Sequence, residues 1–183
     1  MQVTNDWLWE YDAAGKQLYV VIDDGIRHPV PYRSSQLINI HFSQQALDID
    51  DASLFQKVLD DLQQFDELQG PHLLPAALNA MAWCRFGRPQ MPQSWHFQQG
   101  ELASWNSQRK LCELNSGFTQ GLFYILDNDG EFSTVMLLSD SMTLSDIKTF
   151  QRFHVVKILN DRLLPATIEL VQTTKADWNQ RSA

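Results

Sequence analysis

The sequence predicts an α+β protein, in which an N-terminal α/β domain (an antiparallel meander plus two helices) precedes a small β-barrel-like domain. Strand-like runs lie within residues 7–32, helical periodicity follows, and strand-like runs return later in the chain. Between the helical and the second strand-like part lie Pro89 and Pro92, which fit neither a helix interior nor a central strand. We therefore predict domains at 1–89 and 90–174, followed by a flexible polar tail at 175–183.

The N-terminal region has the pattern of a three-stranded antiparallel meander. Residues 7–11 alternate aromatic side chains with Leu and Glu, residues 12–15 supply a turn, and residues 17–23 form the return strand. Asp24-Gly25 is a tight-turn dipeptide, because glycine accepts a positive φ without a Cβ clash. A third strand is expected within residues 26–32, where two prolines confine it to an edge of the sheet.

Two helices follow the meander. Asp50 and Asp51 are natural N-caps for the first helix, whose apolar residues recur every three or four positions from Phe55 to Phe65. Gly70-Pro71 interrupts this pattern. The periodicity resumes between residues 74 and 85, which predicts a second helix ending just before the proline-rich segment.

The remainder of the chain is predicted to be rich in short strands, which favours a small barrel or a sandwich. Asp127-Asn128-Asp129-Gly130 is expected to form a hairpin turn. Residues 149–163 fit both periodicities, and we favour a strand followed by a helical turn. The other strand candidates are residues 95–98, 102–105, 109–114, 121–126 and 132–138.

Composition and charge limit the partners and the cellular compartment that we expect for this protein. The formal net charge is −8, with six Lys/Arg against twelve Asp/Glu in residues 1–89 and eight against ten in residues 90–183. This acidic balance argues against binding to nucleic acid or to an anionic membrane. No apolar run approaches the ~20 residues that span a bilayer, and the first residues lack the pattern of a signal peptide. We expect a soluble cytoplasmic protein whose two cysteines, Cys84 and Cys112, are reduced.

Motifs that carry chemistry are missing from the sequence. The acidic run at 127–131 lacks the glycine and glutamate spacing of a calcium loop. Ser94 has no glycine-bounded nucleophile elbow, the glycines form no phosphate loop, and paired acids occupy turns and helix ends. We therefore expect no catalytic residue, no metal site and no cofactor. The histidines are scattered without the spacing of a zinc site, at His28, His41, His72, His96 and His154.

Aromatic residues are the most unusual feature, with six tryptophans among 183 residues. The simplest explanation is a tryptophan-rich core. The alternative is a binding cleft, because Trp and Arg often dominate protein interfaces. Such a cleft, with Arg88, Lys157 or Arg162 at its rim, would suit an acidic protein partner.

Three segments resemble the ZapC family of cell division proteins. They are the nonapeptide Pro89–Phe97, the run Val156–Leu163 followed by Pro165, and the pattern Trp-x-Trp-x-Tyr-Asp at 7–12. The resemblance implies a non-enzymatic cytoplasmic protein that is recruited to the mid-cell ring, binds FtsZ, promotes lateral bundling of its filaments and stabilises the ring. It also implies an N-terminal α/β domain joined to a C-terminal β-barrel-like domain.

The resemblance further implies a set of partner-binding residues. One departure concerns Gln93, since relatives carry a basic residue there. Apolar contacts or bidentate arginine contacts must therefore contribute more of the affinity. The implied residues are Arg88, Met91, Trp95, His96, Phe97, Lys157 and Arg162 in or beside the two longer motifs, and Tyr19 and Val20 in the N-terminal hairpin.

Other interpretations stay open at this stage. An N-terminal pocket could serve a small-molecule-binding protein or an enzyme, and a Tudor- or SH3-like barrel could recognise a peptide such as the flexible tail of FtsZ. If the protein crosslinks filaments, its net negative charge excludes bulk charge neutralisation. It then needs two binding faces or self-association on the filament, and we expect a monomer or weak self-association.

Overall fold

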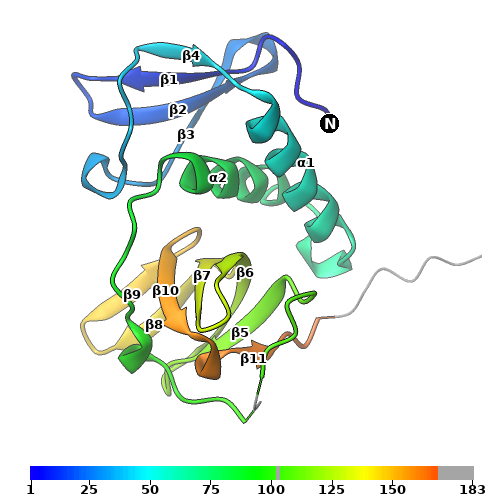
Figure 1. The fold of residues 1–183 in the computed structure, drawn as a ribbon, viewed down its shortest axis with the longest axis vertical. Coiled ribbons are helices and arrows are strands. Elements are labelled where there is room, and N and C mark those ends of the chain that lie inside the picture. Colours follow the sequence, from blue (N-terminus) through cyan, green and yellow to red (C-terminus); the bar gives the residue numbers. More distant parts are fainter. Residues whose placement is uncertain (102–103, 169–183) are drawn as a thin grey trace, which may run out of the picture.

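The computed structural model describes residues 1–101 and 104–168, which form two parts stacked along the long axis of the molecule (Figure 1). The first part contains a four-stranded antiparallel sheet in the order β3-β2-β1-β4, with two helices packed beside it. The predicted meander and its edge strand β3 are confirmed, whereas β4 was not predicted. The elements are β1 (Leu8–Asp12), β2 (Gln17–Ile22), β3 (Ile26–Pro29), β4 (Gln44–Ala46), α1 (Ile49–Gln63) and α2 (Leu73–Phe86).

The start of α1 corrects one prediction. The N-cap is Asp48, and neither Asp50 nor Asp51 caps the helix. Asp48 has an extended backbone, and its side chain accepts a hydrogen bond from the Asp51 backbone N–H at 2.8 Å. Asp51 returns the interaction, because its carboxylate accepts from the Asp48 backbone N–H at 3.1 Å. This reciprocal capping box satisfies two backbone donors that a helix start otherwise leaves without partners.

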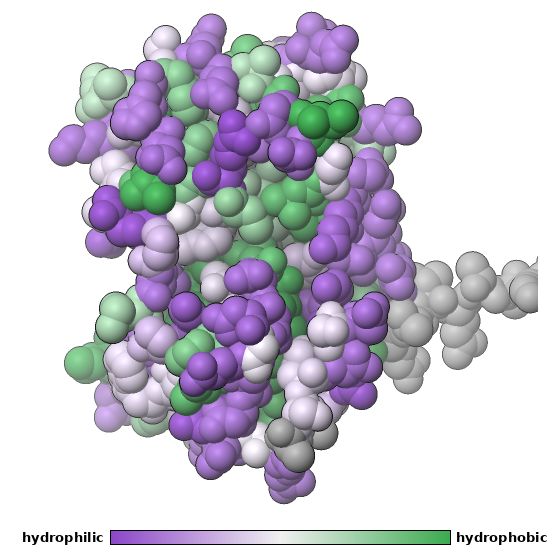
Figure 2. Space-filling view, in the orientation of Figure 1, coloured by the Kyte–Doolittle hydropathy of each residue, from purple (hydrophilic) through white to green (hydrophobic). Residues whose placement is uncertain are grey.

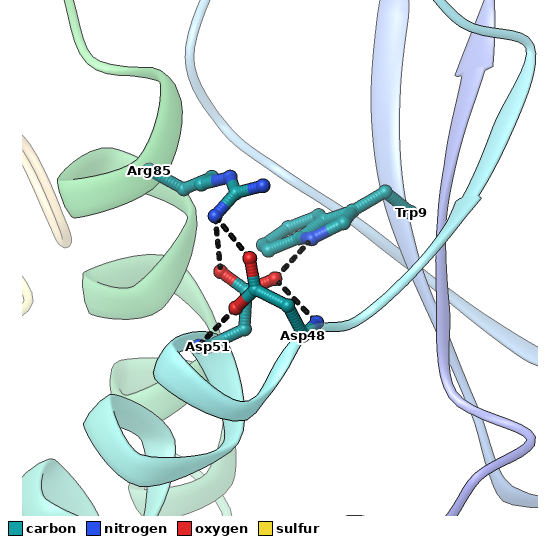
Figure 3. Close-up of polar contacts among 4 residues, drawn as sticks. All are labelled: Trp9, Asp48, Asp51 and Arg85. Atoms are coloured by element: carbon teal, nitrogen blue, oxygen red, sulfur yellow. Dashed lines mark hydrogen bonds and ion pairs between the residues drawn. The ribbon is translucent and has the colours of Figure 1, made fainter.

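The same carboxylates connect three elements of the first part (Figure 3). The buried Asp51 side chain also accepts from Trp9 Nε1 on β1 at 3.0 Å. Arg85 near the end of α2 donates to Asp48 at 2.5 Å and lies 3.8 Å from Asp51. The backbone hydrogen bond from Asp51 is the main cause that lowers the pKa of Asp48 below its ordinary value. One cluster therefore caps α1 and ties it to β1 and α2.

The second part is rich in strands, as predicted. Five strands form an antiparallel sheet in the order β10-β7-β6-β5-β11, and a separate hairpin, β8–β9, packs its apolar side chains against that sheet. Among the described strands the pairing does not close into a ring. The strands are β5 (Leu111–Asn115), β6 (Gln120–Asn128), β7 (Phe132–Leu137), β8 (Ser141–Ser145), β9 (Lys148–Gln151), β10 (Val155–Leu159) and β11 (Leu164–Pro165).

Several local predictions for this part can now be compared with the structure. Strands β5, β6 and β7 and the turn before Phe132 are confirmed, as is a strand followed by a helical turn at 155–162. The predicted strand at 95–98 is wrong, because Ser94–His96 forms a short 3₁₀ helix. The predicted strand at 102–105 lies half outside the described residues, and its last two residues are not in a strand. The β8–β9 hairpin was not predicted.

The two parts share an apolar core. Leu111, Tyr124 and Val155 of the second part belong to the same buried cluster as the helices of the first. Two tyrosines add polar contacts across the junction: the Tyr32 hydroxyl donates to the Phe153 carbonyl at 3.0 Å, and the Tyr124 hydroxyl donates to Asp61 at 2.7 Å. Figure 2 shows a mostly hydrophilic face with hydrophobic residues gathered at this junction.

The division of the chain at residue 89 stays a prediction, and the predicted tail at 175–183 lies outside the described residues. Within the described parts of the chain, none of the helices combines the length and the apolar character needed to cross a bilayer.

Candidate functional site

The proline-rich segment runs along β10, which is an edge strand of the five-stranded sheet. The Gln93 backbone N–H donates to the Lys157 carbonyl at 2.8 Å, and the Leu159 N–H donates to Ser94 Oγ at 2.8 Å. The Gln90 side-chain amide adds a bond to the Val155 carbonyl at 3.3 Å. The segment thereby covers an edge that would otherwise expose backbone donors and acceptors. Its path is set by these bonds to β10.

The short helix Ser94–His96 decides which side chains of this segment reach solvent. Ser94 and Phe97 point inward, with Phe97 only 5% exposed in the core of the second part. Trp95 points outward and is 73% exposed, and Met91 is 81% exposed. An exposed tryptophan on a hydrogen-bonded segment is unusual, because large aromatic side chains are normally mostly buried.

The β8–β9 hairpin adds two residues that the sequence did not indicate: Ile147 in the turn and Lys148 at the start of β9. Lys148 Nζ lies 3.1 Å from His96 Nε2 and 3.3 Å from Gln93 Oε1, and its neighbour Ile147 is 97% exposed. In the view of Figure 1 the hairpin and the short green helix lie side by side. A sequence signal existed, since an Ile-Lys pair stands between two alternating runs, but no local pattern places it beside residue 96. We call the exposed Met91 and Trp95 of the proline-rich segment, together with Ile147 and Lys148 of the hairpin that contacts it, the Trp95 patch.

Lys148 supplies the positive charge of this patch. Its ammonium group has only donors, so His96 Nε2 accepts and the ring proton is assigned to Nδ1. Partial burial and then the Lys148 charge lower the pKa of His96 below its ordinary 6.5. Burial, followed by the same charge, lowers the pKa of His154 to about 4. Both histidines are therefore mostly neutral at pH 7, and no carboxylate of the described residues lies within ion-pair distance of Lys148.

The other basic residues expected at the site lie in different surroundings. Arg88 belongs to the first part, where its backbone N–H donates to Gln36 and its Nε donates to the Ser35 carbonyl at 3.0 Å. Arg162 lies beneath the proline-rich segment, with Nε donating to the Ser94 carbonyl at 3.3 Å. Its Nη1 is 2.9 Å from Asp161, close enough for an ion pair although not aligned as a hydrogen bond.

Lys157 and the N-terminal pair complete the expected set. The Lys157 ammonium lies 5.1 Å from the centre of the Phe132 ring, on the outer side of β10. Tyr19 is covered by the Arg27 guanidinium at 4.0 Å. Val20 is fully buried, so it can affect a binding surface only through the shape of the sheet above it. Met91, Trp95 and His96 thus lie on the proline-rich segment, and Arg162 lies beneath it. Arg88 and Tyr19 lie on the first part of the molecule.

The tryptophans divide between the two explanations considered above. Trp7, Trp9 and Trp83 are buried in the shared core, which confirms the core explanation for them. Trp95 is the exposed exception in the described chain.

Residues 1–101 and 104–168 contain no group of three or more His, Cys, Asp or Glu arranged to hold a metal ion. The surface chemistry of the site is therefore apolar contact beside a lysine.

Comparison with known proteins agrees with the likeness of the motifs. Family models described as cell-division protein ZapC, N-terminal and C-terminal, match residues 1–88 and 89–169. A cell division protein ZapC from Idiomarina loihiensis is 49% identical, with both chains fully covered. Proteins of the same name from Aeromonas hydrophila and Shewanella frigidimarina are 30% and 31% identical, covering 94% and 87% of this chain and 96% and 90% of their own. The chain belongs to the ZapC family of cell division proteins.

Proposed function

We propose that this cell division protein is a non-enzymatic, cytoplasmic FtsZ-binding protein that bundles FtsZ protofilaments laterally and stabilises the ring at mid-cell. The observation that carries the proposal is Trp95, which is 73% exposed on a segment hydrogen-bonded to β10 and directly precedes His96, the residue that Lys148 contacts. A rigid exposed tryptophan loses little conformational entropy when a partner covers it, and such residues often dominate interfaces. Lys148 provides the local charge for an acidic filament.

The proposed contact is local, because the net charge of −8 prevents the whole molecule from acting as a polycation. Lys148 attracts an acidic surface, and Trp95, Met91 and Ile147 provide apolar area once contact is made. His96 and Arg162 hold this surface from below, and buried Phe97 anchors it to the core. Arg88, Lys157, Tyr19 and Val20 stay proposed contributors from the family resemblance.

The test is sedimentation of GTP-assembled FtsZ with the wild-type protein and with Trp95→Ala, at two salt concentrations. High-speed pellets report binding and low-speed pellets report bundles. We expect Trp95→Ala to weaken binding about 30-fold, since truncation of an interface tryptophan removes about 2 kcal/mol or more. Phe118→Ala, at a 58% exposed aromatic residue in the turn before β6, is the matched control and should behave as wild type.

Two outcomes would contradict the proposal. If the wild-type protein stays in the supernatant at both salts, FtsZ is not its partner. If folded Trp95→Ala bundles filaments as the wild type does, the patch is not the docking surface. Filaments of FtsZ without its flexible tail distinguish recognition of the tail from recognition of the globular surface.

Charge-reversal variants test the contributions of the basic residues to FtsZ binding. Lys148→Glu should weaken binding and reduce its salt dependence, because it places a negative charge opposite an acidic partner. Reversal of Arg88 together with Lys157 tests the residues implied by the resemblance. Intact bundling by that folded double variant would remove both residues from the site.

A further inference from the structure

A second binding feature lies on the opposite side of the molecule from the Trp95 patch. A half-open cavity of about 550 Å³ separates the C-terminal end of α1 from the chain around β5 and β11. In Figure 1 these elements lie to the right, whereas the β8–β9 hairpin and the short green helix lie to the left. We call this cavity the α1–β5 pocket; its charged and apolar lining includes Asp61, Phe65, Arg109, Lys110, Leu111 and Ile168.

The described residues that line this pocket carry a net positive charge. Asp61 is the one acidic residue among them, and it accepts a hydrogen bond from the Tyr124 hydroxyl at 2.7 Å. Arg109 and Lys110 have no carboxylate within ion-pair distance among residues 1–101 and 104–168. Lys110 Nζ donates to the Ser107 carbonyl at 3.3 Å, and the Arg109 guanidinium lies 5.8 Å from the centre of the Trp105 ring. Two cations thus stand at one cavity of an acidic protein, held by neutral partners.

The walls of the pocket are apolar between these charges. Leu111 is buried, and Leu111, Phe65 and Ile168 all line the pocket. A volume of this size is within the range of pockets that enclose a small ligand or a few side chains. Its lining therefore matches a ligand with one bulky apolar group and a flanking carboxylate.

We propose that the α1–β5 pocket binds a short acidic peptide segment of a partner protein, with an apolar side chain between Phe65 and Leu111 and carboxylates at Arg109 and Lys110. Peptide recognition by a preformed groove requires an apolar anchor and charges that set its direction, and both are present. Arg109 forms bidentate pairs with carboxylates, whereas Lys110 acts as a point charge. This site is separate from the Trp95 patch and does not depend on filament binding.

The experiment is selection of random twelve-residue peptides on the full-length protein, followed by affinity measurement of the enriched peptides. We expect enrichment of Asp or Glu next to Leu, Ile or Phe. These peptides should bind Arg109→Glu/Lys110→Glu at least about tenfold more weakly, since opposed charges replace attraction. Lys16→Glu/Arg33→Glu changes the net charge equally at exposed sites near the β1–β2 turn and after β3, and this variant should bind them as wild type.

Three results would overturn the proposal: no enriched peptide, enriched peptides without acidic residues, or equal binding by both double variants. A fourth concerns Glu169 and Leu170, which follow the lining residue Ile168 in the sequence. If Glu169→Lys/Leu170→Ser in the full chain binds the peptides more tightly, the protein's own segment is the occupant. FtsZ bundling by Arg109→Glu/Lys110→Glu is expected to equal wild type, so failure here is distinct from failure of the proposed function.

Discussion

Substitution of Asp51 by alanine should destabilise the protein by about 2–4 kcal/mol. It leaves the buried Trp9 indole N–H, which donates to Asp51 at 3.0 Å, without that acceptor, and such a loss costs about 1–3 kcal/mol. It also removes the hydrogen bond of the capping box in which the Asp48 N–H donates to the Asp51 carboxylate at 3.1 Å. Loss of a helix-capping interaction costs about 1 kcal/mol of stability. The lost 3.8 Å contact with Arg85 adds little, because Arg85 keeps Asp48 and is partly exposed.

Thermal and urea unfolding followed by far-UV circular dichroism measure this effect. For a chain of this size, 1 kcal/mol corresponds to about 2–4 °C, so the midpoint should fall by roughly 5–15 °C. Asp50→Ala is the control, since Asp50 is exposed in the same helical turn and should change stability by less than about 1 kcal/mol. If Asp51→Ala unfolds within about 0.5 kcal/mol of wild type, the cluster in Figure 3 does not stabilise the fold as argued.

Two further predictions concern the second part and its junction with the first. Burial and Lys148 lower the pKa of His154 to about 4. The unfolded chain then binds this proton at higher pH, so the contribution of neutral His154 to stability is present above about pH 6.5 and is lost as the pH falls toward 4. NMR titration should place its midpoint near 4, and a value near the ordinary 6.5 would contradict the burial argument. Tyr32→Phe removes the 3.0 Å hydrogen bond to the Phe153 carbonyl and should cost about 1 kcal/mol in urea unfolding. Tyr11→Phe, whose hydroxyl donates no hydrogen bond within the described structure, should cost less, and an equal loss would refute the assignment.

Elements with strong local signals were predicted correctly. The alternation of β1 and β2, the apolar spacing of α1 and α2 and the glycine turn before β7 each depend on residues a few positions apart. The position of the α1 cap was missed because three aspartates stand within four residues. Only the contacts of Asp48 with Asp51 and Arg85 distinguish them.

Elements stabilised by distant contacts were not predicted correctly. Residues 95–98 have strand-forming side chains, but the bonds between residues 93 and 94 and β10 favour a 3₁₀ helix over Ser94–His96 instead of a strand. The β8–β9 hairpin is short and has weak turn signals. Met142, Leu144 and Phe150 stabilise it by packing into the second core. In both cases tertiary packing outweighs local preference.

The sequence by itself determined the α+β class and, through its motifs, the family. These properties depend on local periodicity and on short ordered runs of residues. Only the tertiary structure decided that Trp95 faces solvent while Phe97 is buried, and that Lys148 lies beside His96. It also placed Arg109 and Lys110 opposite the end of α1. The physical reason is that exposure and charge proximity depend on how distant strands pack, and neighbouring residues do not encode that packing.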